Sequence, residues 1–261
     1  SLFIHVAFLK TKKLGKYFIG KIRFMIVDVK PLAHRARKML LYAMPMILVW
    51  TIYLLTFWPG ILSPDSINQW GQAQSGQYSD THPVLYTFSI WLLTRFWLSP
   101  AVVGVIQIIL FACAVSWALY ELNQFGVPTW VAFAFALAFA FSPVNGMMVI
   151  TLWKDVPYSI SILILTILFL KIIFSNGKWM DTRIHGVALG VVTAFIAGWR
   201  HNGVLVVIPC LVLLLVVYRA YWRDIALSLI VFFAGWLLVT EGLNTLLRVE
   251  KHPEFKNIIL L

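Results

Sequence analysis

The chain has 261 residues, of which 61% are hydrophobic and only 12% charged, and its mean hydropathy is +0.86. So little polar surface cannot cover a soluble globule, and the composition therefore indicates a polytopic membrane protein. The net charge of +11 does not indicate nucleic-acid binding, because nearly half of the 21 Lys and Arg residues precede Leu40, next to the first apolar segment. Basic residues there hold the N-terminus in the cytoplasm and attract anionic lipid. We expect membrane lipid, and no nucleic acid, among the partners.

Long runs without polar residues predict helices, because backbone groups in lipid must pair within their own segment. The expected fold is an all-α polytopic bundle: a basic cytoplasmic or interfacial segment, 1–38, precedes a transmembrane domain, 39–261, that has an outer loop at 59–82. The chain ends in an apolar stretch, from which we expect the domain to continue beyond residue 261. Eight apolar segments follow one another at 39–58, 83–98, 101–122, 128–142, 156–174, 184–199, 203–218 and 225–246.

The charges predict that one of these segments does not cross the membrane. Segment 83–98 is the weakest candidate, because it is short, begins at Pro83, contains Arg95 and ends before Pro100. We expect it to be a juxtamembrane or re-entrant helix, which leaves about seven spanning helices. Most Lys and Arg residues then fall on the cytoplasmic side. The expected location is the plasma (inner) membrane, with the N-terminus cytoplasmic and the unusual polar residues extracytoplasmic.

Two carboxylates lie at the membrane edge in this topology, where a charge is costly unless it serves a function. Asp65 follows the first span, and Asp155 opens another long apolar run. Each also has a structural interpretation. Asp65 stands at a favourable helix start, and Asp155 is an acid at the beginning of a helix that Pro157 opens.

Several short motifs in a fixed order resemble those of a known enzyme class. Pro64-Asp65-Ser66 follows the first span, and Asp80-Thr81-His82-Pro83-Val84-Leu85-Tyr86 comes about fifteen residues later. Ser142-Pro143 then precedes Lys154-Asp155-Val156-Pro157, and a Gly186 to Gly190 pair leads to Gly198-Trp199-Arg200-His201-Asn202-Gly203. Together they resemble the GT-C membrane glycosyltransferases, in the branch of the protein O-mannosyltransferases and the lipid A aminoarabinose transferases. The chain also resembles an uncharacterised subgroup of multi-spanning proteins.

The resemblance to the GT-C enzymes implies a sugar donor on a polyprenyl phosphate, and an acceptor hydroxyl of a glycan, lipid or protein of the cell envelope. Asp65 is the candidate base for the acceptor hydroxyl. Asp155 is the second candidate catalytic acid, which would orient the acceptor, bind a divalent cation with Asp65, or pair with Lys154 or Arg200. Arg200 is the best phosphate ligand, since a guanidinium forms two parallel hydrogen bonds. Its alternative role is an interfacial arginine that extends to lipid headgroups.

The remaining candidates are weaker. Lys154 and His201 are further candidate ligands for the substrate, and His82 is a candidate acid or ligand, or else an ordinary loop residue. Trp70 is close enough in sequence to Asp65 to stack on a sugar ring. A divalent cation such as Mg²⁺ or Mn²⁺, held by Asp65 and Asp155, is a further option that no ligand spacing requires.

Two other function classes fit the same architecture. A secondary transporter also places acids and arginines at depth, although neither paired repeats nor broken helices are evident in the sequence. A non-catalytic assembly or lipid-flipping protein would keep the fold without needing Asp65.

Overall fold

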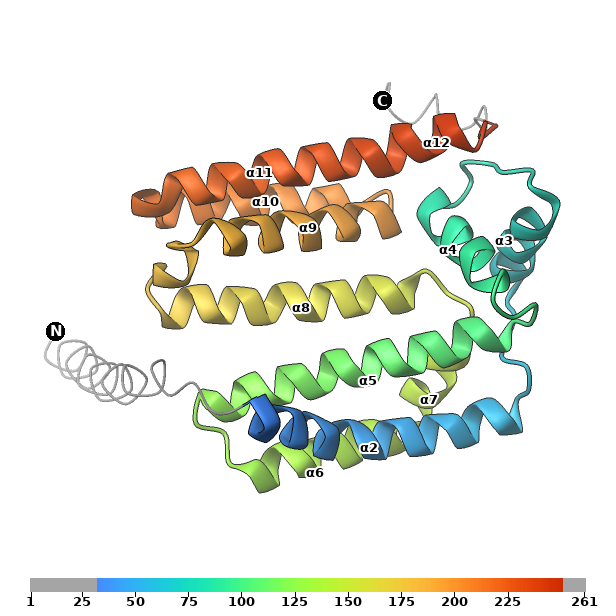
Figure 1. Cartoon of the computed structure of the whole chain (residues 1–261), viewed down its shortest axis with the longest axis horizontal. Coiled ribbons are helices and arrows are strands. Elements are labelled where there is room, and N and C mark those ends of the chain that lie inside the picture. The colour runs from blue at the N-terminus through green and yellow to red at the C-terminus, as the bar shows by residue number, and fades with distance from the viewer. Residues whose placement is uncertain (1–31, 251–261) are drawn as a thin grey trace, which may run out of the picture.

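The computed structural model describes residues 32–250, and these form an all-helical bundle (Figure 1). Its elements in chain order are α2 (Leu32–Thr56), α3 (Pro64–Ser75), α4 (Val84–Thr94), α5 (Ala101–Gln124), α6 (Thr129–Phe141), α7 (Pro143–Ile150), α8 (Asp155–Phe174), η1 (Lys178–Met180), α9 (Arg183–Trp199), α10 (Gly203–Val217), η2 (Arg219–Tyr221), α11 (Trp222–Leu237), the π-helical turn η3 (Leu238–Gly242) and α12 (Leu243–Leu246).

Four of these helical stretches are long and apolar enough to cross a bilayer: α2, α5, α8 and the stretch Arg219–Leu246. The pair α6 and α7 passes the same test together, but its two parts meet at an angle of 64°. The helices α4, α9 and α10 are apolar but shorter. These long apolar helices indicate a membrane-embedded protein, as the composition predicts.

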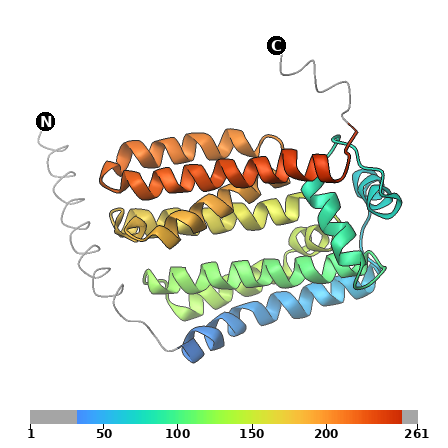
Figure 2. The ribbon, with the colours of Figure 1, turned by 45° about the horizontal axis from the view of Figure 1, so that its top comes forward.

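The helices α3 and α4 lie together at one end of the bundle, where α2 ends and α5 and α8 begin (Figures 1 and 2). In both views α4 runs across the direction of the long helices instead of alongside them. We call this end, which carries α3 and α4, the site end. The opposite end carries the start of α2 and the turns between α5 and α6 and between α8 and α9.

Helix α2 begins seven residues before the apolar segment from which it was predicted, at Leu32 instead of residue 39. Two basic residues in these first two turns have partners on the neighbouring helices. Arg35 lies over the ring of Tyr120 at 5.6 Å, and the Lys38 ammonium donates to Asn123 at 2.6 Å. These contacts extend the helix into the basic segment. Two shorter apolar stretches of the basic segment, 2–9 and 17–27, which we expect to lie along the membrane surface, are outside the described residues.

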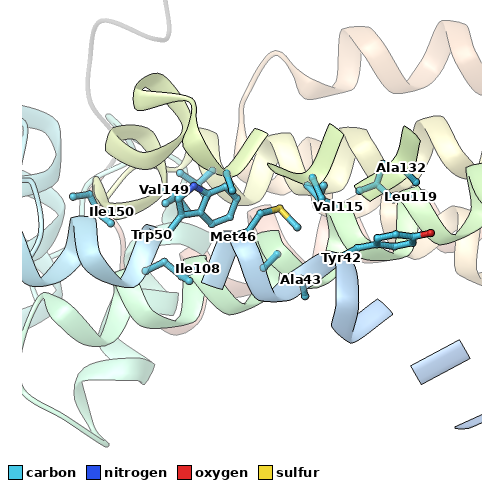
Figure 3. Close-up of a cluster of buried hydrophobic side chains, with 14 of the residues drawn as sticks. Tyr42, Ala43, Met46, Trp50, Ile108, Val115, Leu119, Ala132, Val149 and Ile150 are labelled. Carbon is cyan, nitrogen blue, oxygen red and sulfur yellow. The ribbon is translucent and has the colours of Figure 1, made fainter. Parts of the chain in front are cut away.

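The core on the α2 side is formed by α2, α5, α6 and α7. Trp50 and Met46 of α2 are fully buried among small and branched side chains of the other three helices (Figure 3). The alanines of α6 at every fourth position, Ala132, Ala136 and Ala140, form its buried face. They let α6 lie close to α2, whereas the large side chains of α6 point mostly outward.

Two glycines set the spacing between α9 and α11. A Cβ atom on Gly186 would lie 2.7 Å from the Asp224 carbonyl oxygen, and one on Gly190 would lie 2.7 Å from the Ser228 carbonyl oxygen. Both neighbours are backbone atoms, which cannot rotate away. The Gly186 to Gly190 pair is thus a small-residue seam of the kind that lets membrane helices approach closely.

Gly190→Ala is therefore expected to destabilise the bundle by about 1–3 kcal/mol, the usual cost of forcing extra volume into a packed interface. The measurement is the thermal unfolding midpoint of the purified protein in detergent. Gly71→Ala is the matched control, because Gly71 is also helical and a Cβ there would meet nothing within 4 Å. Equal midpoints for the two variants would contradict this account of the α9–α11 contact.

Candidate active site

The two segments that carry the acids are joined by backbone hydrogen bonds, although about ninety residues separate them in the chain. The Ile61 amide donates to the Ile150 carbonyl and the Leu152 amide donates to the Ile61 carbonyl, each at 3.1 Å. Ile61 and Thr151 thereby form an isolated parallel bridge. The stretch after α2 therefore lies directly against the stretch before α8.

Side chains reinforce this junction. A helix begins here, as the structural interpretation of Asp65 predicts, but its N-cap is Ser63, in a capping box with Ser66, and Asp65 lies in the first turn. The Ser66 hydroxyl donates to the Leu152 carbonyl, and the indole nitrogen of Trp153 donates to the Ser63 hydroxyl, both at 2.7 Å. The start of the helix that carries Asp65 is thus fixed to the residues that precede Lys154 and Asp155.

A buried glutamine of α5 also forms hydrogen bonds to this junction. The side-chain amide of Gln107, in α5, donates to the carbonyls of Val149 and Thr151, each at 2.8 Å. Its oxygen accepts from the Tyr86 hydroxyl at 3.0 Å. Carbonyls at the end of a helix lack partners within the helix, so this glutamine satisfies groups that the break after α7 exposes. We missed Gln107 in the sequence because a lone polar residue in an apolar segment reveals no partner.

A cavity of about 290 Å³ opens where these segments meet. The Asp65 side chain lies on its rim and is 60% exposed, whereas the Asp155 side chain is 35% exposed. Gln69 lies one helical turn after Asp65, a spacing from which its position on the same face could have been predicted. The cavity is lined by Ser63, Pro64, Asp65, Gln69, Trp153, Lys154 and Asp155.

Arg200 does not line the cavity, but it forms an ion pair with a lining residue, Asp155. Its Nη1 lies 3.0 Å from Asp155 Oδ1, a buried atom that receives no well-aligned hydrogen bond. The guanidinium also lies over the ring of Tyr158, 5.4 Å from its centroid. The turn between α9 and α10 thereby places a fixed cation beside the start of α8.

A second chain of contacts runs from Lys154 through His82 to Asp65. Lys154 Nζ lies 2.9 Å from His82 Nδ1, and His82 Nε2 lies 3.8 Å from Asp65 Oδ1. Burial and the charge of Lys154 lower the pKa of His82, and Asp65 raises it less. A neutral His82 that accepts from the Lys154 ammonium carries its proton on Nε2, directed toward Asp65.

Two further predicted ligands, His201 and Lys154, both have their pKa values lowered by burial. His201 lies near Asp80, and burial lowers its pKa more than the contact with Asp80 raises it. Lys154 likewise has its pKa lowered by burial, although the charges of Asp65 and Asp155 oppose this effect.

Trp70 does not line the cavity. It packs instead against the apolar cluster that contains Tyr86 and Leu152. Trp153 lines the cavity instead.

The donor set does not fit a metal centre. Within residues 32–250 no three His, Cys, Asp or Glu side chains come together in an arrangement that could hold an ion. Asp155 is paired with Arg200, and Lys154 lies close enough to Asp65 and Asp155 to interact with both charges. Positive charge from Lys154 and Arg200 therefore already lies near the two acids, and a cation held by Asp65 and Asp155 with water stays a prediction.

A protein-family model described as a family of unknown function (DUF6020) matches residues 74–251. The match includes His82, Lys154, Asp155 and Arg200, whereas Asp65 precedes it. Neither the curated proteins nor the solved structures include a match to the chain.

Proposed function

We propose that this chain, which belongs to the family of unknown function DUF6020, is a membrane glycosyltransferase that moves a sugar from a polyprenyl phosphate to an acceptor hydroxyl. The observation that supports this most directly is that an exposed carboxylate and two cations lie together at one end of a membrane bundle. Asp65 and Lys154 line the cavity, and Arg200, which is outside its lining, is paired with Asp155. Glycosyl transfer from a lipid phosphate requires both a base and a site for the anionic leaving group.

Asp65 is the proposed base. An acceptor hydroxyl is a weak nucleophile at neutral pH, so its proton must be taken up as its oxygen bonds to the anomeric carbon. The Asp65 carboxylate is mostly exposed, which lets an acceptor from the aqueous side reach it. His82, held by Lys154, directs its Nε2 toward Asp65 and so positions the carboxylate without itself contacting the acceptor.

Arg200 and Lys154 are the proposed ligands of the leaving group. As the new bond forms, the bond between the anomeric carbon and the phosphate oxygen breaks, and polyprenyl phosphate leaves with the electron pair. A guanidinium can hold two phosphate oxygens at once, and an ammonium adds a compact charge. Asp155 fixes the Arg200 side chain before the donor arrives, so less ordering is needed during the reaction.

The proposed orientation places the site end on the extracytoplasmic face of the plasma membrane. The first turns of α2, with Arg35, Arg37 and Lys38, are at the opposite end of the bundle, where the positive-inside tendency places them in the cytoplasm. In this orientation α2, α5, α6 with α7, α8, α9, α10 and α11 are the seven proposed crossings, and α4 is the juxtamembrane helix.

The test is donor cleavage by the purified full chain in proteoliposomes. With a radiolabelled polyprenyl-phosphate sugar and a mixture of envelope acceptors, the proposal expects release of free polyprenyl phosphate together with transfer of the label. A transporter would instead move solute across sealed vesicles without any lipid donor, and an assembly protein would do neither. Either of these two results, with no donor cleavage, would overturn the proposed function.

A further inference from the structure

A second and larger hollow, of about 810 Å³, lies between α2 and α6. We call it the α2–α6 groove. Most of its wall is apolar and comes from side chains such as Leu41, Leu48 and Phe133. Its polar lining residues are concentrated at one end, where His34, Arg37 and Lys38 of α2 lie. The groove therefore combines an apolar channel with a cationic end.

The dimensions of the α2–α6 groove match one leaflet of a bilayer. Its lining residues on α2 run from His34 to Val49, about 22 Å along a helix that rises about 1.5 Å per residue. One leaflet contributes about 15 Å of hydrocarbon, and the headgroup region adds several more. The short α6 helix ends at Phe141, where the chain bends by 64° into α7, and Phe141 also marks the inner limit of the groove.

The cationic end of the groove consists of three side chains from the first two turns of α2. Arg37 and His34 are one turn apart on the exposed side of α2. Lys38 is partly buried, and its ammonium is held by Asn123 and by the Thr129 hydroxyl, at 2.6 and 3.2 Å. A fixed ammonium and an adjacent guanidinium at the depth of the headgroups favour a phosphate that carries net negative charge.

We propose that the α2–α6 groove binds one anionic phospholipid from the surrounding membrane, with its phosphate at the cationic end formed by His34, Arg37 and Lys38 and an acyl chain between α2 and α6. This site lies at the opposite end of the bundle from the candidate active site, and it does not depend on the proposed glycosyl transfer. A zwitterionic phospholipid fits the same groove but is attracted less strongly by the cationic end, so the site discriminates between lipids by headgroup charge.

The experiment uses the full chain, delipidated in mild detergent and then offered phosphatidylglycerol or phosphatidylcholine with identical acyl chains. Native mass spectrometry counts the lipid molecules that each protein retains. The wild-type chain is expected to retain one phosphatidylglycerol in preference to phosphatidylcholine. Arg37→Gln is expected to reduce that preference about fivefold, the usual contribution of one basic residue near an anionic headgroup. Arg219→Gln, an exposed arginine outside the groove, is the matched control and should leave the preference unchanged.

A second variant tests the apolar part of the α2–α6 groove. Met44→Trp fills the groove from an exposed position on α2 and should reduce retention of both lipids, whereas Leu213→Trp on the lipid-facing side of α10 should not. An unchanged preference in Arg37→Gln would overturn the proposal. So would a photo-reactive residue at Leu41 that crosslinks to residues 1–31 of the same chain or to a second copy, because the groove would then have a protein occupant.

Discussion

Asp65→Asn is expected to lower the rate of donor cleavage by about 10²- to 10⁴-fold, the contribution typical of a positioned general base. The amide keeps the shape of the side chain and its place in the first turn of α3 but cannot take up the acceptor proton. The capping box that begins α3 uses Ser63 and Ser66 and does not involve Asp65, so the helix should form normally. The measurement is single-turnover release of labelled polyprenyl phosphate.

The control for this variant is Asp181→Asn, which removes an exposed carboxylate far from the cavity, in the turn between η1 and α9. It should cleave donor at the wild-type rate. A second comparison separates catalysis from folding, since Asp65→Asn should keep the wild-type thermal midpoint while losing turnover. Wild-type turnover in Asp65→Asn would remove the proposed base and leave the helix-start interpretation of this acid.

Arg200→Gln is expected to reduce turnover by about 10²- to 10³-fold, comparable to the loss of one donor that stabilises developing negative charge. The effect should lie mainly in the catalytic rate, because charge on the phosphate oxygens grows as the bond to the sugar breaks. Arg200→Lys should restore only part of the rate, since an ammonium lacks the second donor of the guanidinium. Arg219→Gln, outside the site, should have no effect.

The ion pair with Asp155 offers a sharper test of the Arg200 assignment. Removing the guanidinium leaves Asp155 beside the cavity without this partner, so Arg200→Gln also leaves an uncompensated charge. In the double variant Arg200→Gln, Asp155→Asn that charge is gone. If Arg200 binds the phosphate, the double variant should regain thermal stability but remain as inactive as Arg200→Gln. Recovery of turnover together with stability would show that Arg200 serves only to neutralise Asp155.

Much of the helical framework could be predicted from the sequence, because apolar runs bounded by Pro, Gly and charged residues leave few alternatives in lipid. Segment 184–199, for example, is observed as Arg183–Trp199, and segment 203–218 as Gly203–Val217. The separate helix α7 was not predicted, because the bend at Pro143 interrupts a sequence that remains apolar on both sides. The early start of α2 was also missed, since its basic residues are stabilised by tertiary partners that a hydropathy pattern does not contain.

The candidate site was predictable in part. Charge distribution alone placed Asp65, Asp155 and Arg200 at the same end of the bundle, and the structure also brings His82 and Lys154 into contact. The sequence did not reveal how they are held, because the bonds made by Ser66, Trp153 and Gln107 join segments far apart in the chain. Trp70 illustrates the opposite error, since proximity in sequence to Asp65 did not place its ring in the cavity.

The bridge between Ile61 and Thr151 joins the two stretches of chain that line the cavity, and only one of them lies within the residues that match the family. Residues 74–251 match the family, and they contain the lysine, the second acid and the arginine, but the strand-like partner and the cap that anchor them come from residues 61–66. An excised piece that began at residue 74 would retain most of the charged groups and lose the scaffold that holds them in register. In this fold the matched stretch is therefore not self-sufficient, because its charged groups are held in place by residues 61–66, which precede the match.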